Sequence, residues 1–258
     1  MRVAALYDIH ANLPALEAVL DDIRRASVDL VVVGGDVIPG PMPRETLAEL
    51  TSLDIPTRFI YGNGELAVLA QIDATDPSAV SYWGTTSGEP LPEPFRDVLR
   101  WTALQIQPDY DPLLRRWPKT LRIEIDGLGA VLFCHGTPRS ETEGFTRLTP
   151  EDRLLPAFQG LTAPLVVCGH THMQFDRAVG RVRVVNAGSV GMPFGEARAD
   201  WLLLGSGVEL RHTCYSLADA AERVRQTRYP QAHEFADRSI LAPPSEAEML
   251  ELFTNASF

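Results

Sequence analysis

The sequence predicts an α/β fold in which parallel strands are joined by helices. In the first sixty residues, short apolar runs alternate with amphipathic segments, and beyond residue 120 short strand-like runs separated by glycine turns dominate. The chain has 258 residues, of which 45% are hydrophobic and 22% charged, so it has the composition and length of a globular protein with a substantial core. We expect one domain over 1–258, with an inserted helical cap at about 64–118 and a helical tail at about 213–258.

The first sixty residues predict three strands separated by two helices. The strands are expected at 2–7, 29–35 and 57–63, and the helices at 12–26 and 44–50. Asn12 can cap the first helix and Pro14 suits its first turn, while leucines and isoleucine recur along one face. Because consecutive strands are connected through helices, these strands should run parallel to one another.

The cap region differs from its surroundings because it contains several prolines and three tryptophans. A helical pattern covers 94–106. Trp83 and Trp101 could stack on a nucleobase, but we expect them to pack in the cap's own small core.

After the cap, strand patterns predominate until the tail. Strands are expected at 121–125, 130–134, 164–168, 181–185, 201–204 and 208–212. In the tail, Ser216 with Asp219 and Ser245 with Glu248 have the spacing of helix N-terminal capping pairs. Two tail helices are therefore predicted.

Charge and cysteine content narrow the classes of function. The net charge of −11 argues against general nucleic-acid binding, which needs a basic surface. No apolar run approaches a membrane span and no signal peptide pattern follows Met1, so we predict a cytoplasmic protein that does not bind membranes. The three cysteines, Cys134, Cys168 and Cys214, are interpreted as buried core residues and not as a disulfide or a thiolate metal site.

Polar side chains follow five of the predicted strands, at the point where each strand ends. They are Asp8, His10, Asp36, Asn63, His135, His170 and His172, and they include four of the six histidines. In open α/β sheets, ligands bind outside the carboxyl ends of the strands. Each residue alone could be a helix cap, a turn residue or a core histidine, but together they predict a metal site. If the segment 166–175 is extended, His170 and His172 point the same way.

The number and kind of these donors suggest two metal ions. Seven nitrogen and oxygen donors are too many for one tetrahedral ion, but they suit two ions that share a carboxylate. The donor set fits manganese, iron, nickel, cobalt or zinc, and we favour manganese. Two divalent ions with Asp8 and Asp36 leave a charge of about +2, or +1 with a bridging hydroxide. Such a site would attract a phosphate group into an acidic protein.

The ordered series DIH, GGD, GN, HG and GHTH resembles the calcineurin-like metallophosphoesterase superfamily, and its small bacterial and archaeal phosphodiesterase branch in particular. The segment VNAGSVGMP at 185–193 is similar to that branch as well. The resemblance implies two mixed β-sheets packed face to face between helices, the αββα arrangement, with a two-metal centre at the strand ends. It assigns Asp8, His10 and His172 to one ion, Asn63, His135 and His170 to the other, and Asp36 to both.

The sequence departs from the family pattern at two positions. Ala11 stands where family members commonly have glycine, and Gly64 stands where many have a histidine that assists the leaving group. The absence of that histidine suggests a preference for leaving groups that depart without protonation, such as aryl or phosphate groups. Glu65 is expected either to support a metal ligand or to cap the following helix. Arg139 is a candidate contact for substrate phosphate, although a solvated loop arginine is an equally good interpretation.

The resemblance implies a binuclear metal-dependent phosphodiesterase in which a bridging hydroxide attacks phosphorus in line. A phosphomonoesterase or a nucleotide pyrophosphatase could use the same site, and the substrate is expected to be a small phosphate ester, with nucleotides among the candidates. A non-catalytic interaction scaffold, like a retromer subunit that resembles these enzymes, is a further alternative. The chain has no clustered HxHxDH motif, which a metallo-β-lactamase-like hydrolase would need.

Overall fold

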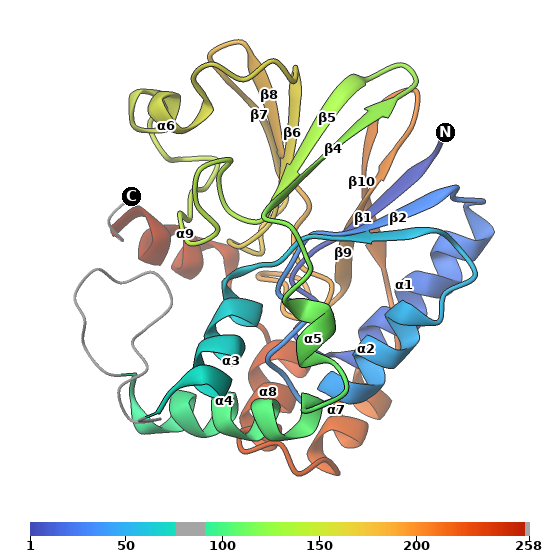
Figure 1. Cartoon of the computed structure of the whole chain (residues 1–258), viewed down its shortest axis with the longest axis vertical. Helices are drawn as coiled ribbons and strands as arrows, with labels where there is room; N and C mark the ends of the chain where they lie inside the picture. The colour runs from blue at the N-terminus through green and yellow to red at the C-terminus, as the bar shows by residue number, and fades with distance from the viewer. Residues whose placement is uncertain (76–90, 256–258) are drawn as a thin grey trace.

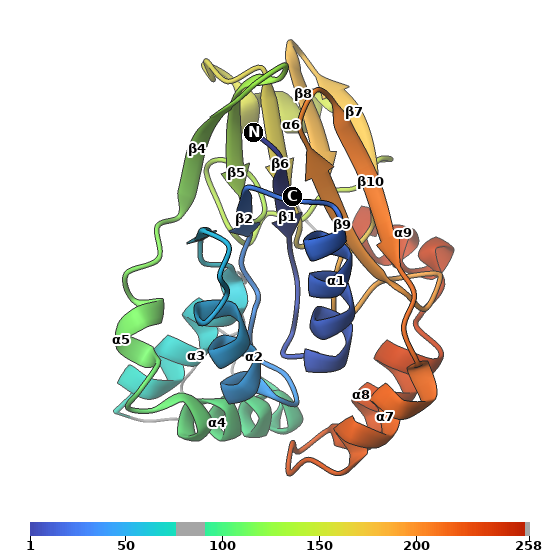
Figure 2. The same ribbon diagram turned by 90° about the vertical axis from the view of Figure 1, so that its right-hand side faces the viewer.

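The computed structural model describes residues 1–75 and 91–255, and its strands form two mixed five-stranded sheets (Figure 1). The strand order is β10-β9-β1-β2-β3 in the first sheet and β4-β5-β6-β8-β7 in the second. Helices lie outside the pair of sheets, as Figure 2 shows from a second direction. The predicted α/β fold with two packed mixed sheets is therefore confirmed.

The first sheet contains the three parallel strands predicted from the first sixty residues. They are β1 (Val3–Leu6), β2 (Leu30–Val33) and β3 (Thr57–Phe59), and β9 (Ala199–Leu204) and β10 (Val208–Thr213) extend the sheet in antiparallel fashion beyond β1. The connecting helices are α1 (Leu13–Arg25) and α2 (Pro43–Thr51). As predicted, the Asn12 side chain caps α1 by accepting a hydrogen bond from the Ala15 N–H at 3.3 Å.

The second sheet contains β4 (Thr120–Ile125), β5 (Gly129–Cys134), β6 (Leu165–Cys168), β7 (Phe175–Val179) and β8 (Val182–Asn186), with α6 (Glu151–Phe158) before β6. Strands β5, β6 and β8 are parallel, whereas β4 and β7 are antiparallel edge strands. Neither β7 nor α6 was predicted from the sequence. Strand β7 begins and ends with buried residues, but its three middle positions are exposed or half-buried, as is common at a sheet edge.

One hydrophobic core lies between the two sheets and fixes how they pack. Its fully buried members include Val32, Phe133 and Leu202. Tyr7 crosses the interface, and its hydroxyl donates a hydrogen bond to the Val167 carbonyl at 3.1 Å. This contact lies one residue from the end of β1, so it positions the residues that follow both strands.

The remaining helices are α3 (Asn63–Asp73), α4 (Glu93–Ile106), α5 (Asp111–Leu114), α7 (Leu217–Arg225), α8 (Ala232–Phe235), the π-helical segment η2 (Ala236–Leu241) and α9 (Glu246–Asn255). Figures 1 and 2 show α4, α7 and α8 together at the end of the molecule opposite the β4–β5 hairpin. The two tail helices predicted from Ser216 and Ser245 begin one residue after these caps. The tail contains α8 and η2 in addition.

Helix α4, which lies in the segment predicted as a cap, shares one hydrophobic cluster with the tail. Val98 of α4 packs with Val224, Tyr229 and Phe235 of the tail, and Trp101 contacts the Tyr229 ring edge-on with centroids 5.5 Å apart. Trp101 therefore packs against the tail and not in a core of the cap alone, which corrects the expectation. Trp83 lies outside the described residues.

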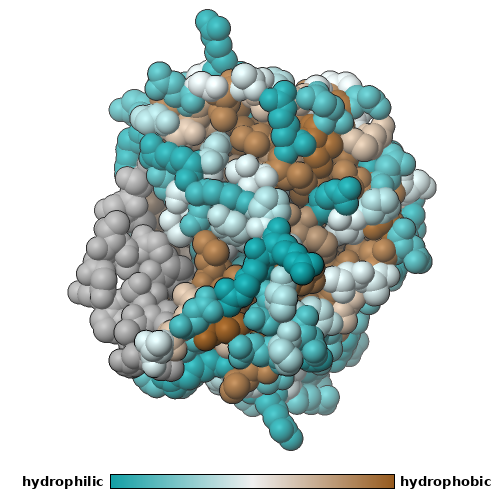
Figure 3. Space-filling view, viewed as in Figure 1, coloured by the Kyte–Doolittle hydropathy of each residue, from teal (hydrophilic) through white to brown (hydrophobic). Residues whose placement is uncertain are grey.

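Two further expectations about the chain are corrected. The predicted strand 57–63 ends at Phe59, and Asn63 is instead the first residue of α3. Cys134 and Cys168 are buried as expected, but Cys214 is exposed. Hydrophobic residues also reach the surface in patches among hydrophilic ones (Figure 3). Within residues 1–75 and 91–255, no helix combines the length and apolar character that a membrane crossing needs.

Candidate metal centre

The structure brings all seven predicted site residues to the carboxyl ends of the strands. Six follow β1, β2, β5 and β6, and the seventh, Asn63, begins α3. Five of them have left-handed backbone conformations: Asp8, His10, Asp36, His170 and His172 have φ values of 53°, 46°, 51°, 67° and 57°. This conformation costs a non-glycine residue roughly 1–2 kcal/mol, so the packed loops around the centre must hold these backbones in place.

The histidine pair therefore converges for a different reason from the one expected. Strand β6 ends at Cys168, and both histidines lie on a bend with positive φ rather than in an extended segment. Asn186 at the end of β8 supports this bend, because its side-chain amide donates to the Gly169 carbonyl at 2.6 Å and lies 3.1 Å from the Thr171 hydroxyl. The backbone N–H of His170 donates to Asp8 Oδ2 at 2.8 Å. The bend is thus tied directly to the first strand end.

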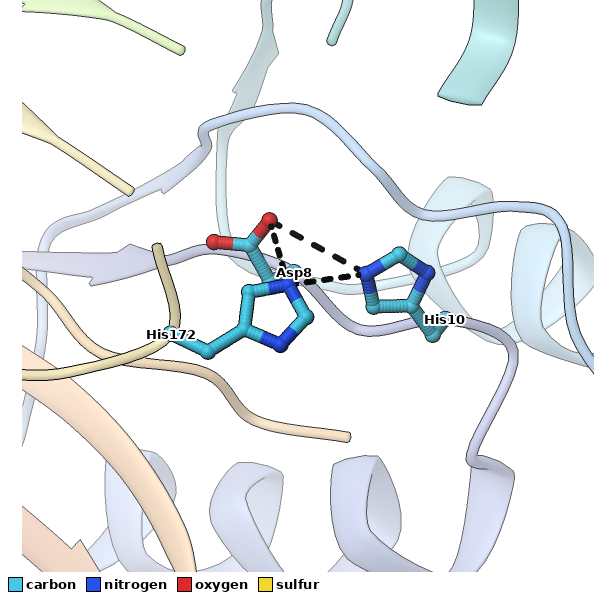
Figure 4. A group of neighbouring side chains, drawn as sticks. All are labelled: Asp8, His10 and His172. Carbon is cyan, nitrogen blue, oxygen red and sulfur yellow. Dashed lines mark hydrogen bonds and ion pairs between the residues drawn. The ribbon is translucent and has the colours of Figure 1, made fainter. Parts of the chain in front are cut away.

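One group of potential ligands consists of Asp8, His10 and His172, whose side chains point toward one another (Figure 4). The Nε2 atoms of His10 and His172 lie 3.1 Å apart, and they are 4.0 and 3.4 Å from Asp8 Oδ1. His172 Nδ1 lies 2.8 Å from the Met192 carbonyl, so a proton on Nδ1 leaves the Nε2 lone pair directed into the group.

The second group consists of Asp36, His135 and His170. His135 Nδ1 donates to the Gly34 carbonyl at 2.9 Å, and its Nε2 faces Asp36 Oδ1 at 3.5 Å and Asn63 Oδ1 at 3.1 Å. Asp36 lies between the two groups, because its other oxygen is 3.9 Å from His10 Nε2. Asn63 therefore adjoins the second group and Asp36 adjoins both.

Two features of the structure indicate that these residues suit divalent metal ions. Asp8 Oδ1 is fully buried and has no hydrogen-bond partner within the described parts of the chain, although three imidazole nitrogens surround it at 3.4–4.0 Å. The converging Nε2 atoms of His10 and His172 would repel each other if both rings carried their proton on Nδ1. A cation placed among these atoms would satisfy the oxygen and both lone pairs, and nitrogen and oxygen donors without thiolates suit it.

The histidines and the two buried carboxyl groups of the candidate centre shift one another's pKa values. Burial lowers the pKa of His135, but Asp36 and Asp8 outweigh burial and raise the pKa to about 10. Burial and a neighbouring histidine lower the pKa of His10 and of His170 to about 4. Burial raises the pKa of Asp8 and of Asp36, yet the adjacent histidines reverse this and hold both pKa values below their ordinary range. The ionised carboxylates of Asp8 and Asp36 thus face a protonated imidazole, that of His135.

Glu65 holds the loop that carries Asp36. Its fully buried carboxylate accepts four backbone hydrogen bonds, from Asp36, Val37, Ile38 and Gly62, at 2.9, 2.7, 3.2 and 2.7 Å. Burial, with the nearby Asp36, raises the pKa of Glu65 to about 7. The Gly62 bond caps the start of α3, and the other three organise the loop after β2. Glu65 thus fulfils both roles that the sequence left open.

Gly64 is enclosed by the same loop. Its N–H donates to Asp36 Oδ1 at 2.6 Å, and a Cβ at this position would lie 2.2 Å from the Ile38 carbonyl oxygen and 2.9 Å from Asp36 Oδ1. A side chain here would displace the backbone that orients Asp36. Local packing therefore disfavours a histidine at position 64, the position where many family members have one.

The segment 185–193 packs beneath the first strand end. The Ser189 hydroxyl donates to the Asp8 carbonyl at 2.7 Å, and the side-chain amide of Asn12 donates to the Gly191 carbonyl at 2.9 Å. The role of this segment was not predicted from the sequence. The small residues in VNAGSVGMP were the available signal, because they allow the backbone to approach the loop after β1 closely.

A cavity of about 580 Å³ opens above the two groups, and His10, Asp36, Asn63, His170 and His172 line its floor. Arg139, the predicted phosphate contact, lies instead on a half-exposed loop where its guanidinium pairs with Glu143 at 2.7 Å. Among the described lining residues, the single arginine or lysine is Arg238 of η2. No local sequence pattern singled it out, because it is an exposed arginine on a tail segment.

Comparisons with known proteins agree with this architecture. Residues 1–205 match the calcineurin-like phosphoesterase superfamily domain. The chain is 24% identical over 249 residues to an uncharacterised protein of Methanocaldococcus jannaschii, covering 89% of this chain and 94% of that one.

Two solved structures extend the comparison. A hypothetical protein of Pyrococcus horikoshii aligns with a TM-score of 0.77 at 20% identity, over 95% of this chain and 99% of that one. A metallophosphoesterase of Sphaerobacter thermophilus aligns with a TM-score of 0.67 at 25% identity, over 92% and 99% of the two chains. With its two buried histidine–aspartate groups and its match to the family over residues 1–205, the chain belongs to the calcineurin-like phosphoesterase superfamily.

Proposed function

We propose that the protein is a metal-dependent phosphodiesterase with two divalent ions. Asp8, His10 and His172 would hold one ion, and His135, His170 and Asn63 the other, with Asp36 between them. The observation that carries the proposal is the buried Asp8 Oδ1, which has no hydrogen bond in the described chain and is approached by histidines of both groups, His10 and His172 of the first and His135 of the second. When bound, the ions would strengthen water as a nucleophile at neutral pH and stabilise negative charge on the phosphoryl oxygens.

The chain's own residues prepare the site for that chemistry. The carbonyls of Gly34 and Met192 fix the Nδ1 atoms of His135 and His172, so their Nε2 atoms stay directed inward. Glu65 and the Gly64 N–H hold Asp36 between the groups. Such prearranged donors avoid reorganisation when a charged substrate arrives. The proposed metals are manganese, iron, nickel, cobalt or zinc, with manganese preferred.

The test is hydrolysis of bis-p-nitrophenyl phosphate by metal-stripped protein, before and after manganese is added. We expect activity to appear with the metal, to be lost in Asp36→Asn, and to persist in the control Asp21→Asn, which alters an exposed carboxylate. Circular dichroism of each variant reports whether it is folded. Greater activity on p-nitrophenyl phosphate would make the protein a monoesterase. No activity on either ester with any of the five metals would favour the interaction scaffold.

A further inference from the structure

The walls of the cavity are mostly apolar, with Gln231, Glu234 and Arg238 among their few polar groups, and they come largely from three separate parts of the chain. Helix α4 contributes Phe95 and Val98, and the loop after β8 contributes Met192 and Phe194. The tail contributes aromatic rings from the segment before α8 and from α8 and α9, among them Tyr229. We call this space the aromatic chamber. Its volume of about 580 Å³ is in the range of sites that enclose small organic ligands.

Phe194 links the aromatic chamber to the candidate metal centre. Its ring stacks on the His172 imidazole with centroids 5.1 Å apart and an interplanar angle of 20°. Phe253 of α9 approaches the Phe194 ring with centroids 6.5 Å apart. An organic group attached to a phosphate at the centre would therefore meet aromatic surface at once, and aromatic rings pack well against flat π-systems.

Arg238 gives the chamber its one fixed positive charge among the described lining residues. It is exposed, and none of the hydrogen bonds or ion pairs within residues 1–75 and 91–255 engages its guanidinium, although it lies close enough to Glu248 to help lower that pKa. The Glu248 carboxylate is bound by Ser245. Arg238 is therefore available to pair with an anionic group of a ligand.

We propose that the site takes phosphate esters whose organic group is a flat aromatic ring, held in the aromatic chamber beside Phe194, with Arg238 pairing a second negative charge of the ligand. This proposal rests on the proposed function, because the first phosphate is placed at the metal centre. Nucleotides and simple aryl phosphates share this chemistry, and Arg238 favours ligands with more than one anionic group.

The first experiment compares inhibitors that carry the same phosphate. Adenosine monophosphate and ribose 5-phosphate, and likewise phenyl and methyl phosphate, compete with bis-p-nitrophenyl phosphate in the manganese-loaded protein. Because stacking of a base contributes roughly 1–3 kcal/mol, we expect the aromatic member of each pair to bind at least about fivefold more tightly. Equal inhibition within both pairs would overturn the proposal. Tighter binding of phenyl phosphate alone would restrict the ligand class to simple aryl esters. Tighter binding of the aromatic member in both pairs would extend the ligand class to nucleotides.

Two variants test the named residues. Phe194→Leu should reduce the aromatic preference while ribose 5-phosphate binds nearly as before, and Phe253→Leu provides a second test if Phe194→Leu fails to fold. In the unaltered protein, adenosine diphosphate should bind more tightly than adenosine monophosphate, and Arg238→Gln should remove this affinity advantage. The control Arg228→Gln changes an exposed tail arginine that does not line the cavity, so it should retain that advantage. An unchanged advantage in Arg238→Gln would overturn the role of Arg238.

A binding measurement separates this proposal from the proposed function. Trp101 contacts Tyr229, which lines the chamber, so its fluorescence should change when an aromatic ligand enters. Titration with adenosine monophosphate and with ribose 5-phosphate needs no turnover, and Trp101→Phe identifies the signal. Selective binding without hydrolysis would refute the phosphodiesterase and retain the aromatic chamber. Hydrolysis without selective binding would support the phosphodiesterase and refute the aromatic chamber.

Discussion

At the scale of single residues, Glu65 shows how one buried carboxylate can organise the candidate centre. Both of its oxygens accept two backbone N–H groups, so neither position tolerates a donor. Glu65→Gln would turn an NH₂ group toward two N–H donors in either orientation. Because unsatisfied buried groups cost roughly 1–3 kcal/mol each, we expect a loss of stability of at least that size together with weaker metal binding.

Urea unfolding and metal titration of Glu65→Gln check this prediction, with Glu209→Gln on the exposed face of β10 as the matched control. The control should unfold at the same urea concentration as the unaltered protein. If Glu65→Gln were equally stable and bound manganese equally well, the four hydrogen bonds would not be what orients Asp36.

Ala11 offers a second prediction at this scale. It has a φ of +49° and a fully buried methyl group, at the position where the family commonly has glycine. In Ala11→Gly, relief of left-handed strain, roughly 1–2 kcal/mol, offsets the lost methyl burial and the greater freedom of the unfolded chain. We expect stability within about 1 kcal/mol of the original.

The control is Ala15→Gly, which removes an equally buried methyl from α1, where glycine carries no such benefit. Its stability should fall by roughly 1–2 kcal/mol. Thermal unfolding of the two variants side by side checks the difference. Equal losses would mean that the loop backbone stores no strain at Ala11.

The same scale explains what the sequence could and could not predict about the site. Asp8, Asp36 and the four strand-end histidines were predictable because they follow successive apolar runs, at the strand ends where ligands bind in open α/β sheets. Asn63 was found by its position after glycine, although it begins a helix. Arg238 was not predictable, because its placement depends on how the tail folds back over the centre, and no local pattern records that.

At the scale of elements, strands with continuous apolar runs were predictable, and those at the margins were not. Strands β2 and β6 have buried, valine-rich sequences, whereas β7 has only its two ends buried and followed the histidine segment without a clear turn. Helix α6 contains Pro156, which weakened its pattern. The start of α3 was hidden because the apolar run that begins in β3 continues to Tyr61, two residues before α3 begins at Asn63. Tertiary packing, and not local propensity, decides these boundaries.

The start of α3 supports a prediction about Gly64. Restoring a histidine there would place a Cβ 2.2 Å from the Ile38 carbonyl oxygen, so the loop after β2 must move. We expect Gly64→His to lose stability by roughly 1–3 kcal/mol and to lose metal affinity, with no gain on poor leaving groups. Manganese titration and hydrolysis of alkyl and aryl diesters check both parts. A variant that bound metal normally and gained on alkyl diesters would show that the loop accommodates the ring.

At the scale of the whole molecule, the centre joins the two sheets. Asp8 and Asp36 follow strands of the first sheet, whereas His135, His170 and His172 follow strands of the second, and each group of ligands draws on both. A bound ion would thus connect the halves of the sandwich at one end, in addition to the core between them. At a free concentration a thousand times its Kd, a metal ion that binds only the folded protein would increase the free energy of unfolding by about 4 kcal/mol.

Metal binding should also release protons. The raised pKa of His135, about 10, means that its ring is protonated at pH 7 without metal, whereas a coordinating imidazole is neutral. At least one proton must leave, so affinity should fall about tenfold for each pH unit of acidification near neutrality. Calorimetry of manganese binding in two buffers of different ionisation enthalpy measures the number released. Identical heats in both buffers would contradict the prediction, and His233→Gln, at an exposed site, serves as the control.

The sharing of each ligand group between the two sheets has a consequence for kinetics. Neither group is complete until the sheets have docked, because its members come from distant parts of the sequence and meet only across that interface. Such long-range contacts cost chain entropy before they contribute stability, so we expect the centre to form late in folding. Metal ions should therefore leave the rate of folding nearly unchanged and slow the rate of unfolding. The bound ions would then hold the two sheets together only after they have packed.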